Sequence, residues 1–210
     1  MRTIGLIILA SLLTLARAPG AVALTLENAR VGFTAERLLV LDGKTYVGRI
    51  WHMPGAERHE QSLQGVNSVF FILHDKSSVA DIVLPKLHTV AEFPAPTALT
   101  ILEDPGLLQH PVGGERIDGI RTTKYAVDYR APQGHATGYL WLSRAGIPIK
   151  CEGQFRAPHG RVTTIRWELR HLRIGPQPAA LFAVPRGFSK LTPEALAPLL
   201  GLRLAPPRAR

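Results

Sequence analysis

The stretch WLSRAGIPIKCEGQF, residues 141–155, reads as two β-strands joined by a tight turn at Ala145-Gly146. After the turn, apolar and polar residues alternate, and residues two positions apart share one face of a strand. The apolar face holds Ile149, Cys151, Gly153 and Phe155. Because a thiol among apolar side chains keeps a high pKa, we expect Cys151, the only cysteine of the chain, to be structural and not a nucleophile.

The next predicted strand, residues 161–174, places Trp167 on one face with Ile165 and Leu169. Two strands share an apolar face only when their register brings the same faces together. For Cys151 and Trp167 to meet, the connection over residues 157–160 must give an odd-length loop or a bulge. We predict one of these two.

Strand signals of the same kind, separated by short turns rich in glycine and proline, run through most of the chain. The predicted strands cover residues 33–41, 45–53, 57–63, 68–74, 79–84, 87–93, 121–130, 136–143, 147–156 and 161–174. Such short connections predict a mainly β protein with few helices and an antiparallel sheet built from hairpins. Helical signals are limited to irregular turns over residues 97–109 and a helix over 195–200, which Thr192 caps and Pro193 begins.

Residues 136–143 are apolar on both sides of the predicted strand. Tyr139 and Trp141 face one way, and Leu140 and Leu142 face the other. This pattern fits a curved sheet whose inner face lines a cavity while a helix packs on one surface. It fits an ordinary two-sided core equally well, and periodicity does not distinguish the two.

The N-terminal residues 1–23 have the grammar of a cleaved secretory signal peptide, with Arg2, an apolar run and a small-residue end. An uncleaved anchor helix is the alternative, although the apolar run is shorter than the roughly 20 residues that span a bilayer. Residues 24–204 have the length of one domain. Residues 205–210 read as a disordered basic tail.

The chain carries a formal net charge of +9, and arginine outnumbers lysine 19 to 6. Arginine suits phosphate and carboxylate groups, so anionic headgroups or an acidic protein partner are candidate ligands. The other explanation for the excess of arginine is the amino-acid composition that the source genome favours. No basic motif interleaved with aromatic residues is present, so we predict no nucleic-acid partner.

Motifs of catalysis are missing from the sequence. It contains no G-x-S-x-G, no H-E-x-x-H and no phosphate-binding loop, and its eight histidines lack the spacing of a zinc site. We therefore predict no enzyme, metal or cofactor. His52, His59 and Glu60 fall in one hairpin and could converge, but we expect solvated strand residues. A Ser/His/Asp triad is spatial, so an exported hydrolase stays open as a third hypothesis.

Several stretches resemble the LolA/LolB-like superfamily of periplasmic lipoprotein carriers. Residues 33–35, FTA, and 46–60, YVGRIWHMPGAERHE, resemble its opening strands. Residues 141–150, WLSRAGIPIK, and 181–188, LFAVPRGF, resemble a later strand and its closing signature. GERIDG at 114–119, followed by Lys124-Tyr125, resembles an uncharacterised, outer-membrane lipoprotein-sorting-like subgroup.

The resemblance implies a curved, incomplete antiparallel β-barrel with short helices covering a concave face. It implies a soluble protein of the Gram-negative periplasm, with only transient membrane contact, that holds a lipid or an acylated protein in a hydrophobic cavity and serves envelope lipid or lipoprotein trafficking. The expected cavity lining is Trp51, Phe71, Tyr139, Trp141 and Trp167. Arg49 and Arg58 are the expected headgroup contacts, with a solvated strand face as their alternative.

A second hypothesis assumes the same fold but a different function. The protein would then be an interaction or regulatory module of the envelope that docks an acidic protein partner through its basic face, without lipid transfer.

Overall fold

A computed structural model describes residues 28–63, 66–74, 79–94, 102, 104, 106–132 and 134–199. The predicted signal peptide over residues 1–23 and the predicted tail over 205–210 lie outside this part of the chain. No helix within it is long and apolar enough to span a membrane.

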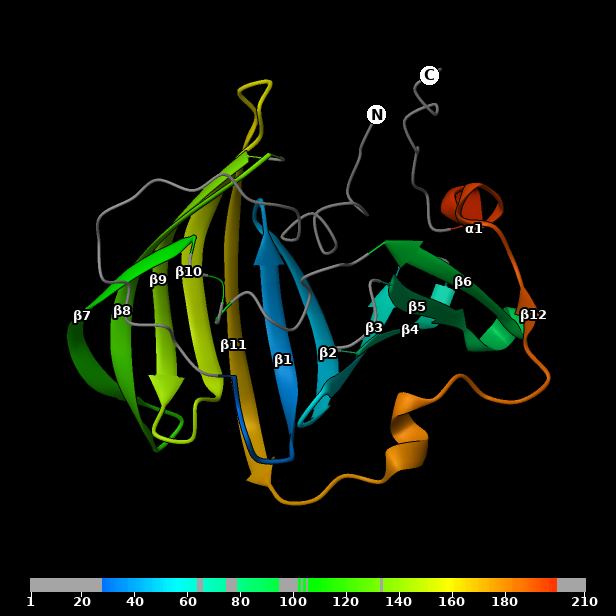
Figure 1. The fold of residues 1–210 in the computed structure, drawn as a ribbon, viewed down its shortest axis with the longest axis horizontal. Helices are drawn as coiled ribbons and strands as arrows, with labels where there is room; N and C mark the ends of the chain where they lie inside the picture. The colour runs from blue at the N-terminus through cyan, green and yellow to red at the C-terminus, as the bar shows by residue number, and fades with distance from the viewer. Residues whose placement is uncertain are drawn as a thin grey trace.

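Twelve strands in the described part of the chain form one sheet (Figure 1). They are β1 (Phe33–Leu41), β2 (Lys44–Met53), β3 (Ala56–Leu63), β4 (Val66–His74), β5 (Val79–Leu84), β6 (Thr89–Pro94), β7 (Leu107–Ile117), β8 (Ile120–Ala131), β9 (Gly134–Ser143), β10 (Pro148–Arg156), β11 (Val162–Ile174) and β12 (Ser189–Lys190). The predicted mainly β fold is therefore confirmed, and β1 and β5 begin and end at the predicted residues.

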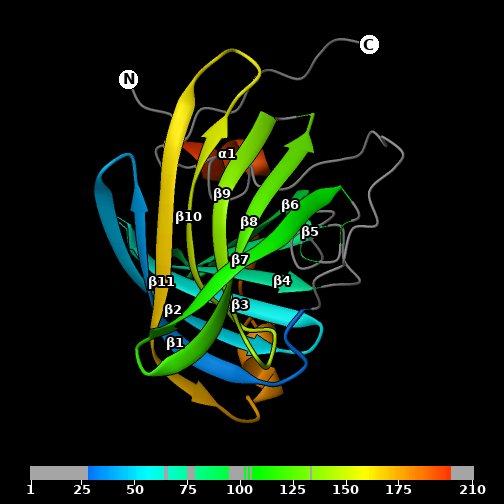
Figure 2. The ribbon, with the colours of Figure 1, turned by 90° about the vertical axis from the view of Figure 1, so that its left-hand side faces the viewer.

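The sheet is two antiparallel meanders joined side by side. Strands β1 to β6 form one meander and β7 to β11 form the other, and β1 pairs with β11 to join them. Only β12 runs parallel to its neighbour, β6. Figures 1 and 2 show the sheet curling strongly while β7 and β6–β12 remain separate edges. This is the predicted curved and incomplete barrel.

The hairpin of β10 and β11 confirms the predicted odd-length loop. Cys151 pairs with Trp167, and the ladder runs without a shift to Arg156 and Val162. Five residues, 157–161, remain in the connection, which is closed by a hydrogen bond from the Ala157 N–H to the Arg161 carbonyl (2.8 Å). The odd length puts Cys151 and Trp167 on the same face.

The predicted helical turns over residues 97–109 are wrong at their C-terminal end, where Leu107 begins β7 and pairs with Tyr129. Of the remaining residues, 97–101, 103 and 105 lie outside the described part of the chain. The Asp104 carboxylate accepts a hydrogen bond from the Gly106 N–H (2.7 Å), which makes a turn directly before the strand. Strand β12 has only two residues and so carries no alternation from which it could be predicted.

Several turns of the sheet lie together at one end (Figure 1, bottom). The β7–β8 and β9–β10 turns lie at this end, as does the start of β1. The β7–β8 turn reaches β11, where Asp118 accepts a hydrogen bond from the His171 N–H (2.9 Å). A core cluster lies next to this contact. Its buried members are Ala29, Phe33, Ala35, Ile50, Ile117, Trp141, Ile147, Ile149 and Leu169.

The C-terminal segment covers the other half of the sheet. A 3₁₀ turn, η3 (Ala179–Phe182), buries Phe182 against Ile72 and Val83 of β4 and β5. The helix α1 (Pro193–Leu199) begins at the predicted Pro193, and Thr192 caps it by accepting a hydrogen bond from the Ala195 N–H (3.3 Å). Leu196 is fully buried against strands β4 to β6. The helix therefore packs on β4 to β6, whereas Leu140, Trp141 and Leu142 are buried in other clusters.

Candidate functional site

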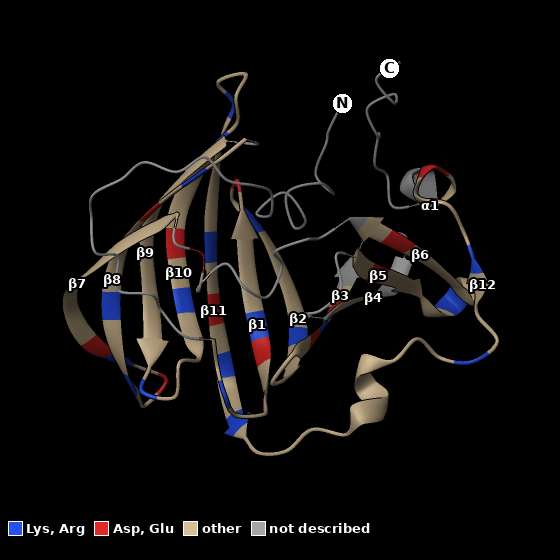
Figure 3. Cartoon of the chain, in the orientation of Figure 1, with Lys and Arg blue, Asp and Glu red and all other residues tan. Residues whose placement is uncertain are grey.

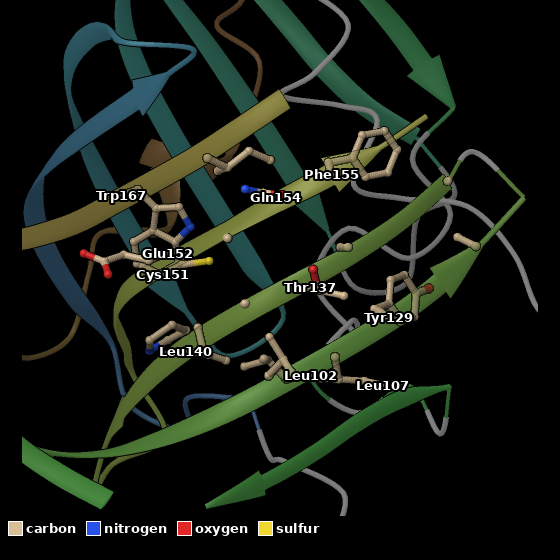
Figure 4. A pocket seen from close by; sticks show the side chains of 18 of the residues that line it. Leu102, Leu107, Tyr129, Thr137, Leu140, Cys151, Glu152, Gln154, Phe155 and Trp167 are labelled. Carbon is tan, nitrogen blue, oxygen red and sulfur yellow. The ribbon is translucent and has the colours of Figure 1, made fainter. Parts of the chain in front are cut away.

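A pocket of about 320 Å³ lies on the face of the sheet formed by β8 to β11 (Figure 4). It falls within the roughly 300–1,000 Å³ range of small-molecule sites. Its lining is mainly apolar and includes Leu102, Leu107, Val127, Tyr129, Ala131, Ala136, Leu140, Cys151, Phe155, Ile165 and Trp167.

Strand register explains why these residues share a face. Cys151 pairs with Leu140 on one side and with Trp167 on the other. One step along, Gly153 pairs with Gly138. Gly138 and Gly153 have no side chains, and larger side chains surround them. The space above the two glycines therefore stays empty and forms the pocket.

The glycine pair also brings two strands unusually close. A Cβ atom on Gly138 would lie 2.1 Å from the Glu152 carbonyl oxygen, and one on Gly153 would lie 2.5 Å from the Thr137 carbonyl oxygen. Glycine is therefore required at both positions.

Residues that precede β7 cover part of the pocket. Leu102 is buried against Leu107 and Leu140. Tyr129 donates a hydrogen bond from its hydroxyl group to the Asp104 carboxylate (3.0 Å). Burial and the negative charge of Asp104 raise the pKa of Tyr129 to about 12, so the hydroxyl stays protonated and the contact persists at neutral pH.

Cys151 lies in the pocket wall as a free thiol of intermediate exposure, and Figure 4 shows its sulfur among the lining side chains. Burial, with a smaller effect of Glu152, raises its pKa to about 12. The thiolate is the nucleophilic form, so Cys151 is a weak nucleophile, as its strand position predicted.

A hydrogen-bonded network on β1 to β3 meets the pocket at Glu57, which belongs to its lining. The two Glu57 oxygens accept hydrogen bonds from His52 Nδ1 (3.0 Å) and His59 Nε2 (2.8 Å). Arg37 donates to His59 Nδ1 (2.6 Å) and reaches Gln61 Oε1 (3.4 Å). Register places all five residues on one face of these strands.

The partners of each histidine fix its protonation. His52 meets the Glu57 carboxylate with Nδ1 and the Ala29 carbonyl oxygen with Nε2 (2.9 Å), so both nitrogens donate and the ring is cationic. His59 accepts from Arg37 at Nδ1, so only Nε2 donates and the ring is neutral.

The pKa directions agree with this assignment. Burial opposes the charge of His52, but the hydrogen bond to Glu57, the charge of Glu57 and the hydrogen bond to the Ala29 carbonyl group together outweigh it and raise the pKa. Burial and then the charge of Arg37 lower the pKa of His59. Burial also opposes ionisation of Glu57, yet its two histidine partners hold its pKa far below the usual range. Burial lowers the pKa of Arg37 to about 10, so Arg37 stays charged at neutral pH.

The expectation that His52 and His59 are solvated strand residues is wrong. His52 is 6% exposed and stacks on Phe33 with 4.8 Å between ring centroids. Glu60 belongs to a different contact, an ion pair with Arg58 (2.7 Å). The alternation His52, Glu57, His59 across one hairpin was the signal that could have identified the network, with Glu57 as the carboxylate.

Of the five aromatic residues expected to line the cavity, the structure places Trp167 in the lining of this pocket, and the other four are not among its lining residues. Phe71 packs with Leu196 under α1. Tyr139 and Trp141 alternate with Leu140 and so lie on the opposite side of β9. Trp141 is buried there, under the ammonium groups of Lys124 (4.8 Å) and Lys150 (4.4 Å).

Trp51 lies between the two arginines that were expected to contact a headgroup. The guanidinium groups of Arg49 and Arg58 are 5.7 and 5.6 Å from its ring centroid. Arg58 is buried and donates to the Leu181 carbonyl oxygen (3.0 Å), which ties β3 to the C-terminal segment. Arg49 is exposed. Neither arginine is among the residues that line this pocket.

Within the described residues, no group of three or more histidine, cysteine, aspartate or glutamate side chains is arranged to hold a metal ion. Charged residues of both signs are spread over the strands (Figure 3).

No known protein-family profile matches the sequence, and no curated protein matches it. Several solved structures are similar. One is MucB of Pseudomonas aeruginosa in complex with MucA, with 21% identity, 74% of this chain and 56% of that chain covered, and a TM-score of 0.46. Another MucB structure has 19% identity, 76% and 60% coverage and a TM-score of 0.48.

The chain spans between 55% and 60% of the MucB chains that it matches. It is also similar to a LolA superfamily protein of Nitrosomonas europaea, with 8% identity, 75% of this chain and 92% of that chain covered, and a TM-score of 0.42. These are likenesses of fold at low sequence identity.

Proposed function

We propose that the protein binds the acyl chain of a lipid or of a lipidated ligand in the pocket on β8 to β11. The observation that carries this proposal is the apolar pocket on the concave face, with glycines at its centre and larger apolar side chains around them. Most of the lining residues are apolar, so apolar burial should supply most of the affinity.

Burial of each CH₂ group contributes about 0.8 kcal/mol. Binding should therefore strengthen as an alkyl chain lengthens and level off when the pocket is full. A soluble role in periplasmic lipid or lipoprotein trafficking, without catalysis, is the physiological setting that we propose. It rests on the apolar pocket together with the predicted signal peptide.

Native mass spectrometry tests the proposal. The full chain is expressed with export in a Gram-negative host, purified without detergent, and measured before and after lipid extraction. We expect a stoichiometric adduct whose mass matches an extracted lipid. A protein that is free of adduct and remains so when mixed with excess lipid would overturn the proposal.

A second candidate function is supported by the edge strand β7. Within the described part of the chain β7 pairs only with β8, and it exposes Leu108 (49%) and Val112 (47%). An open edge of this kind can accept a strand from another chain. The positive net charge favours an acidic partner. Capture of a partner that survives delipidation, and is lost when Val112 becomes Lys, would support this role.

A further inference from the structure

The polar lining residues of the pocket include Asn28, Glu57, Thr137, Glu152 and Gln154, and the two histidines bonded to Glu57 have no free donor. Two acidic residues belong to the lining, Glu57 and Glu152. Glu152 is neutralised by Lys150 (3.0 Å) and Arg166 (3.1 Å), and its side chain points away from the pocket in Figure 4. Glu57 is therefore the carboxylate that a bound molecule would meet.

Every ring nitrogen around Glu57 already has a partner. His52 donates to Glu57 and to the Ala29 carbonyl oxygen. His59 donates to Glu57 and accepts from Arg37. Neither histidine has a donor left for an anionic group.

The Glu57 carboxylate, in contrast, retains acceptor capacity. A carboxylate has about four lone-pair positions, and the two histidines occupy one on each oxygen. Its side chain is 21% exposed and belongs to the pocket lining. His52 and Arg37 in this network are cationic, but an anionic head in direct contact with Glu57 would meet like charge at the nearest group, whereas a donor would form a charge-assisted hydrogen bond.

We propose that Glu57 selects amphiphiles whose head donates hydrogen bonds and carries no negative charge, that is, a hydroxyl-bearing or ammonium-bearing head. This inference rests on the proposed function, because the acyl chain occupies the apolar part of the same pocket. It moves the head-group contact from Arg49 and Arg58, which do not line this pocket, to the Glu57 network on β1 to β3.

Three amphiphiles with the same alkyl chain test the selectivity on the full-length, delipidated protein. They are dodecanoic acid, 1-monododecanoylglycerol and dodecylamine, titrated near neutral pH below their micelle concentrations. The acid is then anionic and the amine cationic. We expect the glycerol ester and the amine to bind about tenfold or more tightly than the acid, since one charge-assisted hydrogen bond corresponds to roughly that factor.

Each alternative outcome is decisive. Equal or tighter binding of dodecanoic acid overturns the head-group inference and leaves acyl binding intact. Absence of binding by all three overturns the proposed function and this inference with it. A preference for the amine alone restricts the head to ammonium, and a preference for the ester alone restricts it to hydroxyl groups.

Two matched variants locate the effect. Glu57→Gln removes the charge in the pocket, so the preference over dodecanoic acid should fall to about one. Glu92→Gln removes an exposed acidic residue that is not among the lining residues, and should leave the preference unchanged. The ranking on the unmodified protein tests the inference even if Glu57→Gln does not fold, and an unchanged preference in folded Glu57→Gln contradicts it.

Discussion

Glu57 holds two histidines in opposite protonation states, and this makes stability depend on pH in two directions. The pKa of His52 is raised above its usual 6.5, so His52 stabilises the fold fully below that value and loses the contribution as pH rises through its folded pKa. The pKa of His59 is lowered from 6.5. His59 therefore contributes fully above 6.5 and loses the contribution as pH falls through its folded pKa.

In the unmodified protein, the free energy of unfolding should fall as pH rises above 6.5, because of His52, and as pH falls below 6.5, because of His59. We predict that His52→Gln abolishes the first decrease and that His59→Gln abolishes the second. Chemical denaturation across this pH range measures both slopes. Each variant is compared with the unmodified protein at the same pH. The contributions of other titrating groups then cancel in the difference in the free energy of unfolding. Parallel profiles for the three proteins would contradict the assigned protonation states.

Cys151 should react slowly despite being free. With a pKa of about 12, its thiolate fraction near neutral pH is far below that of an ordinary cysteine. We predict that a maleimide labels the native protein at least about tenfold more slowly than the denatured protein. Because Cys151 lines the pocket, a bound amphiphile should slow labelling further. Native labelling as fast as denatured labelling would show that the thiol is not buried.

Alternation in the sequence correctly predicted the side of the strand for Cys151 and its meeting with Trp167, because both depend only on local period and loop length. It did not predict the place of Arg58. That side chain is buried by η3, which is more than a hundred positions away in the chain, and no local pattern carries such a contact.

The Gly138–Gly153 pair sets the spacing of β9 and β10. We predict that Gly138→Ala lowers the free energy of unfolding by more than about 2 kcal/mol, since its Cβ would overlap a backbone carbonyl oxygen that cannot move alone. Gly175→Ala is the matched control, because a Cβ there has no neighbour within 4 Å, and should change stability by less than about 0.5 kcal/mol. Equal effects in urea denaturation would contradict a close approach of the two strands.

The C-terminal segment is fastened to β3 by Arg58. We predict that Arg58→Ala costs about 1–3 kcal/mol, because it leaves the Leu181 carbonyl oxygen and Glu60 without this partner. Arg49→Ala, which removes the exposed arginine on the same tryptophan, should cost less than about 1 kcal/mol. Thermal unfolding of both variants checks the difference, and a larger effect at Arg49 would refute it.

Most strands could be predicted from turn signals and alternation, but β7 could not. Its sequence contains Pro111, Gly113 and Gly114, which argue against a central strand. An edge strand tolerates them, and β7 has an irregular register between Pro111 and Gly113. Edge position is a property of the assembled sheet, so it could not be recognised within this segment.

In the whole molecule, one curved sheet combines three features. A side-chain cluster lies at one end, the face of β8 to β11 is apolar and hollow, and the face of β1 to β3 carries the Glu57 network. The resemblance in sequence predicted the curved sheet and an apolar cavity. Which residues line the pocket depends on strand register and on bulges such as that between Pro148 and Lys150, which sequence alternation alone does not fix.

The most direct test is amphiphile binding by a variant whose pocket is filled. Ala136 lines the pocket, whereas Ala126 lies on β8 beside the lining residue Val127 and so faces the opposite way. We predict that Ala136→Phe weakens binding of 1-monododecanoylglycerol by at least about tenfold, since the ring takes up space needed by several CH₂ groups. Ala126→Phe should bind as the unmodified protein does. Full binding by folded Ala136→Phe would contradict the claim that this pocket holds the acyl chain.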